Sequence, residues 1–194
     1  MELSRLFNNA KYKGSKGYLN IQKKYEIGRT ILYFFISASL FIAGYIQTKE
    51  RINVLSLVAA LGCLPACKSL VVAIMFCRYK SLDKTIADKI EENAKELYSH
   101  FDMVFTSEKK NFLINHLVVH QNLIIGYSNH PTFEEKAFYE HIQNILTLDG
   151  HNEVTVKIFT DITKYEQRVT QLQEVPFSSE QAISLCQTLK SVTL

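Results

Sequence analysis

Two long apolar segments near the start of the chain most limit what it can fold into. Residues 30–48 contain no charged side chain, and residues 54–76 contain a single one, Lys68. A helix needs roughly 20 residues to cross a hydrocarbon core of about 30 Å, so each segment is long enough to span a membrane. The alternative is a pair of core helices in a soluble protein, but little polar surface would be left to cover them. We therefore expect a transmembrane helical hairpin over residues 30–77, with 49–53 as the connection, and the lipid bilayer as its surroundings.

Basic residues are concentrated before the first apolar segment. Residues 1–29 hold seven Lys or Arg against two Glu, and residues 78–84 add three more, whereas the connection holds only Lys49 and Arg51. Cytoplasmic flanks of membrane helices are enriched in Lys and Arg, so the pattern predicts a multi-pass protein with both termini in the cytoplasm. The basic arm 1–29 is also suited to contact anionic lipid headgroups. Because this polar arm comes first, we expect the first span to be retained and not cleaved as a signal peptide.

Lys68 is the least expected residue of the second segment. A lysine at the centre of a membrane helix costs about 2.5–3.5 kcal/mol on insertion, which the surrounding Val, Leu, Ile and Phe residues offset. Pro65 disrupts the helix ladder and frees backbone carbonyls to which Lys68 could donate. Either Lys68 is satisfied locally or by a thinned membrane, or it faces a polar cavity or a subunit interface. Two helices cannot enclose a pore, so the second interpretation requires a homo-oligomer or a partner protein.

After the apolar segments the pattern becomes that of a small α+β domain. An amphipathic pattern over residues 78–99 predicts a connecting helix, and the domain itself is expected over 100–194. Thr132 and Glu135 have the spacing of a capping box at the start of its first helix, and Asp161 and Ser178 are candidate caps for the last two. The expected order is helix, three-stranded meander, helix, strand and two helices, with strands at 102–107, 111–119, 122–127 and 153–159.

This order of elements resembles the core of the restriction-endonuclease-like nucleases. In that family the second and third strands carry acidic residues that hold a divalent metal. The matching stretches here, 111–120 and 122–128, contain no carboxylate. The first four elements are also similar to a double-stranded-RNA-binding domain, but Glu134, Glu135 and Glu140 stand where basic residues would be needed. We therefore expect no nucleic-acid partner.

No catalytic or cofactor-binding motif is present in the sequence. It contains no glycine-rich phosphate loop, no GxSxG elbow and no HExxH. His116 and His120 would point to the same side of a strand, which makes them a weak candidate cluster for zinc if another histidine approached them. Ordinary partly buried histidines are the alternative, so we expect no metal and no cofactor.

Three functions are compatible with these patterns. The first is a non-enzymatic scaffold or sensor, anchored by two membrane helices, whose cytoplasmic domain binds a protein or ligand within an oligomer. The second is a ligand-gated membrane effector or channel-like assembly that uses Lys68. The third is a membrane-tethered enzyme of a type that the sequence does not identify.

Overall fold

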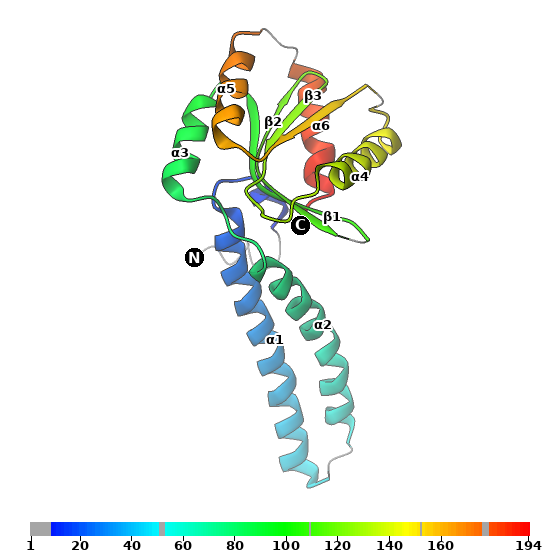
Figure 1. Ribbon diagram of the computed structural model, residues 1–194. Coiled ribbons are helices and arrows are strands. Elements are labelled where there is room, and N and C mark those ends of the chain that lie inside the picture. The colour runs from blue at the N-terminus through cyan, green and yellow to red at the C-terminus, as the bar shows by residue number, and fades with distance from the viewer. Residues whose placement is uncertain (1–8, 51–52, 109, 152, 176–178) are drawn as a thin grey trace. The chain divides into compact units, whose positions relative to one another are not determined.

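The computed structural model describes residues 9–50, 53–108, 110–151, 153–175 and 179–194 (Figure 1). Over these residues the protein is an α+β chain with six α-helices and one four-stranded mixed sheet, which confirms the α+β part of the predicted fold class. The chain divides into two compact units. One contains residues 19–80 and is called the hairpin below. The other contains residues 10–18 and 81–194 and is called the α+β unit.

The hairpin is formed by α1 (Tyr18–Thr48) and α2 (Val54–Cys77). The helix α1 ends at Thr48 and α2 begins at Val54, on either side of the segment expected to connect them. Asn53 caps α2, since its side chain accepts from the Ser56 backbone N–H at 2.8 Å while Ser56 Oγ accepts from the Asn53 N–H at 2.9 Å. The helix α1 begins at Tyr18, directly after Gly17 with its left-handed φ of 72°. Residues 18–29 of the basic arm are therefore continuous with the first apolar segment.

Small and hydroxyl side chains set the register of the two helices. Thr30 Oγ1 lies 2.9 Å from Ser69 Oγ. One heptad further along α1, a Cβ on Gly62 would lie only 2.8 Å from Ser37 Oγ, and one heptad beyond that a Cβ on Gly44 would lie 2.7 Å from the Leu55 Cβ. The helices thus pack antiparallel with a period of seven residues, and the absent side chains of the two glycines allow their close approach.

The sheet of the α+β unit has the order β1-β2-β3-β4. The first three strands form the predicted antiparallel meander, and β4 pairs parallel to β3 after a crossover through α4. The strands are β1 (Tyr98–Thr106), β2 (Asn111–His120), β3 (Leu123–Tyr127) and β4 (Thr155–Phe159). The helices are α3 (Lys84–Asn93), α4 (Glu135–Leu148), α5 (Ile162–Gln173) and α6 (Ser179–Ser191).

Helices cover both faces of this sheet (Figure 1). Phe138 and Ile142 of α4 and Leu185 of α6 pack on one face, in a core that includes Phe105 and Leu117. The other face is covered by α3 and α5, in a second core that contains Ile90, Val118, Ile125, Tyr165 and Val169. Burial on both faces explains why every residue of β2 from Phe112 to His120 is buried, and not every second one.

The helix ends test the predicted caps. The capping box from Thr132 and Glu135 is wrong, because α4 begins at Glu135 with Glu134 as an N-cap whose side chain makes no capping bond. Thr132 Oγ1 instead lies 3.1 Å from His130 Nδ1. The Asp161 cap is confirmed, since its carboxylate accepts from the Thr163 N–H at 2.9 Å. Ser178 lies outside the described residues, and within the predicted 78–99 segment only Lys84–Asn93 is helical.

Candidate functional sites

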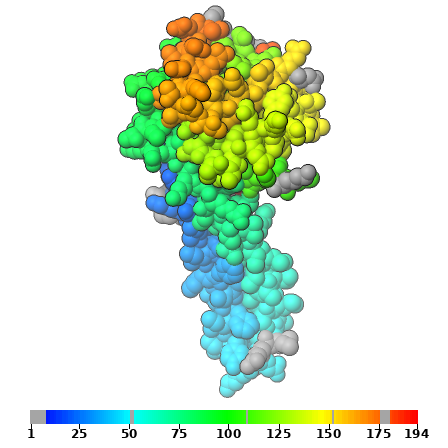
Figure 2. All heavy atoms as spheres, viewed as in Figure 1, coloured from blue at the N-terminus to red at the C-terminus, as the bar shows by residue number. Residues whose placement is uncertain are grey.

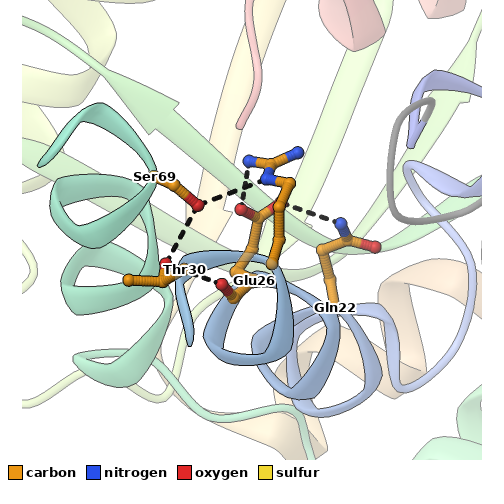
Figure 3. Close-up of polar contacts among 5 residues, drawn as sticks. Gln22, Glu26, Thr30 and Ser69 are labelled. Atoms are coloured by element: carbon orange, nitrogen blue, oxygen red, sulfur yellow. Dashed lines mark hydrogen bonds and ion pairs between the residues drawn. The ribbon is translucent and has the colours of Figure 1, made fainter. Parts of the chain in front are cut away.

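A polar network joins the two helices of the hairpin (Figure 3). Glu26 of α1 pairs with Arg29 and accepts from Gln22 Nε2 at 3.0 Å. Arg29 Nε donates to Ser69 Oγ of α2 at 3.3 Å, next to the contact of Ser69 with Thr30. Glu26 is almost completely buried, and a buried charge is costly unless it has partners. Arg29 and the Gln22 amide provide these partners. In the sequence, this network corresponds to polar residues that come just before the charge-free segment, among them Gln22, Glu26 and Arg29.

The polarity of the hairpin is the reverse of that of a water-soluble protein. Thr30, Ser37 and Ser69 are buried at the helix interface together with alanines of α2. The outer surface is apolar, as in Phe35 with 69% of its area exposed and Leu57 with 64% (blue to cyan in Figure 2). Other exposed apolar residues of the hairpin are Ile31, Ile42, Ile46, Val54, Leu61, Leu64 and Val71. Both helices are long and apolar enough to cross a membrane, and most of their apolar segments are exposed, so the two helices suggest membrane association.

The register places Lys68 near one end of the charge-free part of α1. Ser69 contacts Thr30, so Lys68 lies level with Ile31, one turn or less from Arg29. The Lys68 side chain is exposed and makes no hydrogen bond or ion pair within the described part of the chain. Pro65 lies inside α2 without ending the helix, and its side chain is exposed. Lys68 thus belongs to the outer surface of the hairpin and not to the interface of its helices.

The two candidate histidines are both buried in β2. His116 Nδ1 lies 2.6 Å from the Tyr165 hydroxyl, and its ring centroid lies 4.2 Å from that of Phe101. Burial, with a smaller contribution from the charge of His100, lowers the pKa of His116 to about 3. His120 Nε2 lies 3.0 Å from the Val175 carbonyl oxygen. In the regions that the structure describes, no three His, Cys, Asp or Glu side chains lie close enough together to hold a metal ion.

Asp102 and Asn115 form an irregularity that sequence reasoning missed. They lie opposite each other in β1 and β2, both are buried, and Asp102 has a left-handed φ of 54°. The Asp102 carboxylate accepts from the Ser81 hydroxyl, and Asn115 Oδ1 accepts from the Asn129 N–H at 2.9 Å. Both strands switch faces here, because Phe101 packs toward α3 and α5 while Met103 packs toward α4 and α6. Two polar residues among apolar ones were the available signal, since Asp tolerates the left-handed region better than most residues.

The outer edge of β1 is covered by both ends of the α+β unit. The Phe101 N–H donates to the Gly14 carbonyl at 2.8 Å, and the Leu194 N–H donates to the Val104 carbonyl at 3.0 Å. Lys13 Nζ donates to the Thr193 carbonyl, which links the two covering segments. A covered edge cannot accept a further strand.

Residues 10–18 are part of the α+β unit, and their side chains also pair with other residues of this unit. Lys16 pairs with Asp88 at 2.7 Å and with Glu91 of α3. A side chain at Gly14, whose φ is 80°, would also crowd the His100 ring, with a Cβ 3.1 Å from Nδ1. Two lysines of the arm that was expected to contact lipid headgroups thus have partners within the protein.

The outer edge of β4 is open along the described residues. Thr155 donates to Asn122 and Phe159 accepts from Ser128, so the odd-numbered residues of β4 bond to the β3 side. The N–H and C=O groups of Val156 and Ile158 consequently point away from the sheet. Gln143 of α4 covers the preceding outward carbonyl, that of Val154, at 2.7 Å.

A shallow groove of about 410 Å³ runs beside this open edge. Phe138 and Tyr139 of α4 line it together with Val156 and Ile158 of β4, and the α4 side of the groove also carries Glu135, Lys136 and Glu140. Lys157 lies between Val156 and Ile158 in the strand, and its side chain is exposed on the opposite face of the sheet. Its Nζ lies 5.2 Å from the centre of the Phe159 ring. The edge therefore combines outward-facing backbone groups, a groove lined by both apolar and charged side chains, and the exposed Lys157 on the opposite face of the sheet.

No family model, curated protein or solved structure matches this chain.

Proposed function

We propose that this protein is a two-helix membrane anchor that presents its α+β unit to a protein partner without catalysing a reaction. The observation that carries the proposal is the reversed polarity of the hairpin. Thr30, Ser37 and Ser69 are buried at its interface, while large apolar side chains such as Phe35 and Leu57 face outward. Water would oppose this distribution, whereas a hydrocarbon solvent favours it because polar groups then find their partners between the helices.

The proposed orientation places both ends of the hairpin in the cytoplasm. Support comes from the basic residues, which flank the open end of the hairpin and are few in the 49–53 connection. The α+β unit follows α2 and would lie on the cytoplasmic side. Little of the chain would be exposed on the other side of the membrane.

We propose the open edge of β4 as the partner-binding element. An extended peptide could pair with the outward groups of Val156 and Ile158, and its apolar side chains could enter the groove beside Phe138. A residue opposite Lys157 would point to the same side as this lysine, so a carboxylate is the favoured side chain there. Two copies pairing through β4 about Lys157 would instead bring like charges together. The preferred occupant is therefore an extended segment of a different protein with an apolar-acidic-apolar pattern.

Membrane insertion is tested by carbonate extraction of membranes from cells that express the full chain. Phe35→Asp places a charge on the outer surface of the hairpin, at a cost of about 2.5–3.5 kcal/mol for insertion, and should shift the chain out of the membrane pellet. Leu148→Asp is the matched control, because Leu148 is 90% exposed on α4 of the α+β unit. Recovery of the unaltered chain in the carbonate-soluble fraction would contradict the proposal.

Orientation is tested with a membrane-impermeant maleimide on a variant whose four cysteines are replaced by alanine. His151→Cys should react only after permeabilisation, whereas Lys49→Cys in the connection should react in intact cells. The opposite labelling pattern would overturn the orientation and leave the insertion result untouched.

The β4 site is tested by fluorescence anisotropy with labelled Ser-Val-Glu-Val-Ser and Ser-Val-Lys-Val-Ser peptides and the full chain in nanodiscs. The Glu peptide should bind more tightly, and Lys157→Glu should reverse the preference. Val156→Pro removes one outward N–H without touching the bonds to β3 and should abolish binding of both peptides. Equal binding of both peptides to the unaltered chain, or none, would contradict the assignment.

The channel-like alternative predicts a different measurement. Liposomes that contain the purified chain would leak ions, and Lys68→Leu would stop the leak. Tight liposomes, with and without this substitution, are what the anchor proposal expects.

A further inference from the structure

A groove of about 330 Å³ lies along one side of the hairpin, between α1 and α2. Its walls are apolar or aromatic, and Ser37 and Gly62 pass each other within it. Its main lining residues are Tyr33, Ile36 and Leu40 of α1 and Val58, Leu61 and Pro65 of α2. Over the eight α1 residues from Tyr33 to Leu40 the groove runs about 11 Å along the helix axis. Its dimensions and lining suit part of an acyl chain.

Two cationic side chains lie at one end of this groove. Lys68 follows Val58, Leu61 and Pro65 at spacings of three and four residues, so it belongs to the same face of α2. Arg29 precedes Tyr33 by four residues and belongs to the same face of α1. The contact between Thr30 and Ser69 places both cations at one level, on the two sides of the groove.

The charges at this level favour an anion. Arg29 is compensated by Glu26, whose carboxylate is buried against it. The exposed Lys68 ammonium has no partner in the described part of the chain, which leaves one net positive charge at the end of the groove. A phosphate there would accept a charge-assisted hydrogen bond from Lys68.

We infer that the hairpin binds one anionic phospholipid, with an acyl chain in the groove and its phosphate at Lys68. The inference rests on the proposed membrane insertion. It gives Lys68 a partner at the boundary of the charge-free segment, so the lysine needs neither a pore nor a subunit interface. A zwitterionic lipid would bring its own ammonium toward Lys68, so an anionic headgroup should be preferred.

The test uses the full chain in nanodiscs of seven parts phosphatidylcholine to three parts phosphatidylglycerol, followed by native mass spectrometry after release. We expect one retained phosphatidylglycerol per chain, and at least a fivefold loss of the lipid-bound species in Lys68→Gln. Lys68→Arg should restore retention. Lys49→Gln is the matched control, since Lys49 is an exposed cation at the other end of the hairpin.

Each contrary outcome has a separate meaning. A chain that does not enter nanodiscs would refute the proposed anchor as well. A chain that enters but retains both lipids equally, or retains phosphatidylglycerol equally in Lys68→Gln, would overturn only the lipid site. A lipid-free dimer would also overturn it, because a second copy would then occupy the groove.

Discussion

The hairpin and the α+β unit distribute their polar and apolar side chains in opposite ways between the interior and the surface. In the α+β unit large apolar side chains such as Phe138 and Ile125 are buried, and most charged ones lie outside. In the apolar part of the hairpin, from Thr30 to Met75, the buried side chains are small or polar, and the large apolar ones lie outside. The difference indicates that burial of apolar area drives the first unit, whereas close contact and hydrogen bonds between helices hold the second.

The largest expected effect comes from replacing one phenylalanine with alanine in each of the two units and comparing the results. Phe138→Ala removes a ring that is 1% exposed and packed against Phe105 and Phe112, and should cost about 3–5 kcal/mol of the free energy of unfolding of the α+β unit. Phe35→Ala, at a site 69% exposed, should change the stability of either unit by less than about 0.5 kcal/mol. Hydrogen exchange of backbone amides in nanodiscs, read by mass spectrometry, gives both values.

A loss of several kcal/mol in Phe35→Ala would break the comparison. It would mean that Phe35 packs against protein, such as a second copy, and not against lipid. Unchanged exchange of strand amides in Phe138→Ala would equally contradict the role of this core.

The limits of prediction from sequence follow the same division. The ends of the helices at Thr48 and Val54 were predictable because a polar connection interrupts two apolar runs and Asn53 is a natural cap. The start of α1 at Tyr18 was not, since residues 18–29 mix charges with apolar residues and no local signal separates a loose arm from a helix. The cap at Asp161 could be predicted because it depends only on residues next to it in the sequence.

Features that depend on distant residues could not be read from local patterns. Gly14 covers β1 at Phe101, a contact between residues far apart in sequence. The face switch at Asp102 and Asn115 was hidden because β1 and β2 are buried on both sides. The position of Lys68 along the hairpin could not be predicted, because it depends on the register of α1 against α2. The contact of Thr30 with Ser69 establishes this register.

The stability of the α+β unit should depend on pH through two histidines, the buried His116 and the half-buried His100. Burial lowers the pKa of His116 to about 3 and that of His100 to about 4, below the ordinary value of about 6.5. The unfolded chain therefore binds more protons than the folded one at pH 4–6, so stability is complete above about pH 6.5 and falls on acidification. Each histidine should contribute a slope of at most about 1.4 kcal/mol per pH unit, approached near pH 5.

Urea unfolding of the full chain at pH 4.5–7.5 measures this slope. His116→Phe should reduce it, and Tyr165→Phe is the control, because it removes the hydroxyl next to His116 Nδ1 without removing the imidazole. An unchanged slope in His116→Phe would show that His116 is accessible to protons in the folded state.

The smallest expected effect lies in the hairpin and sharpens the comparison most. Ser69→Ala removes the hydroxyl that contacts Thr30 Oγ1 and accepts from Arg29 Nε, and should weaken the helix contact by about 0.6–1.7 kcal/mol, the range typical of hydrogen bonds between membrane helices. Ser39→Ala is the matched control on the exposed surface, where the hydroxyl donates to the Phe35 carbonyl of its own helix, at 2.8 Å, and has no other hydrogen bond among the described residues. Unfolding of the hairpin in mixed micelles with increasing dodecyl sulfate, followed by helicity, measures both. If Ser39→Ala cost as much as Ser69→Ala, polar contacts at the interface would have no special role, and the hairpin would be held by the shape of its small residues alone.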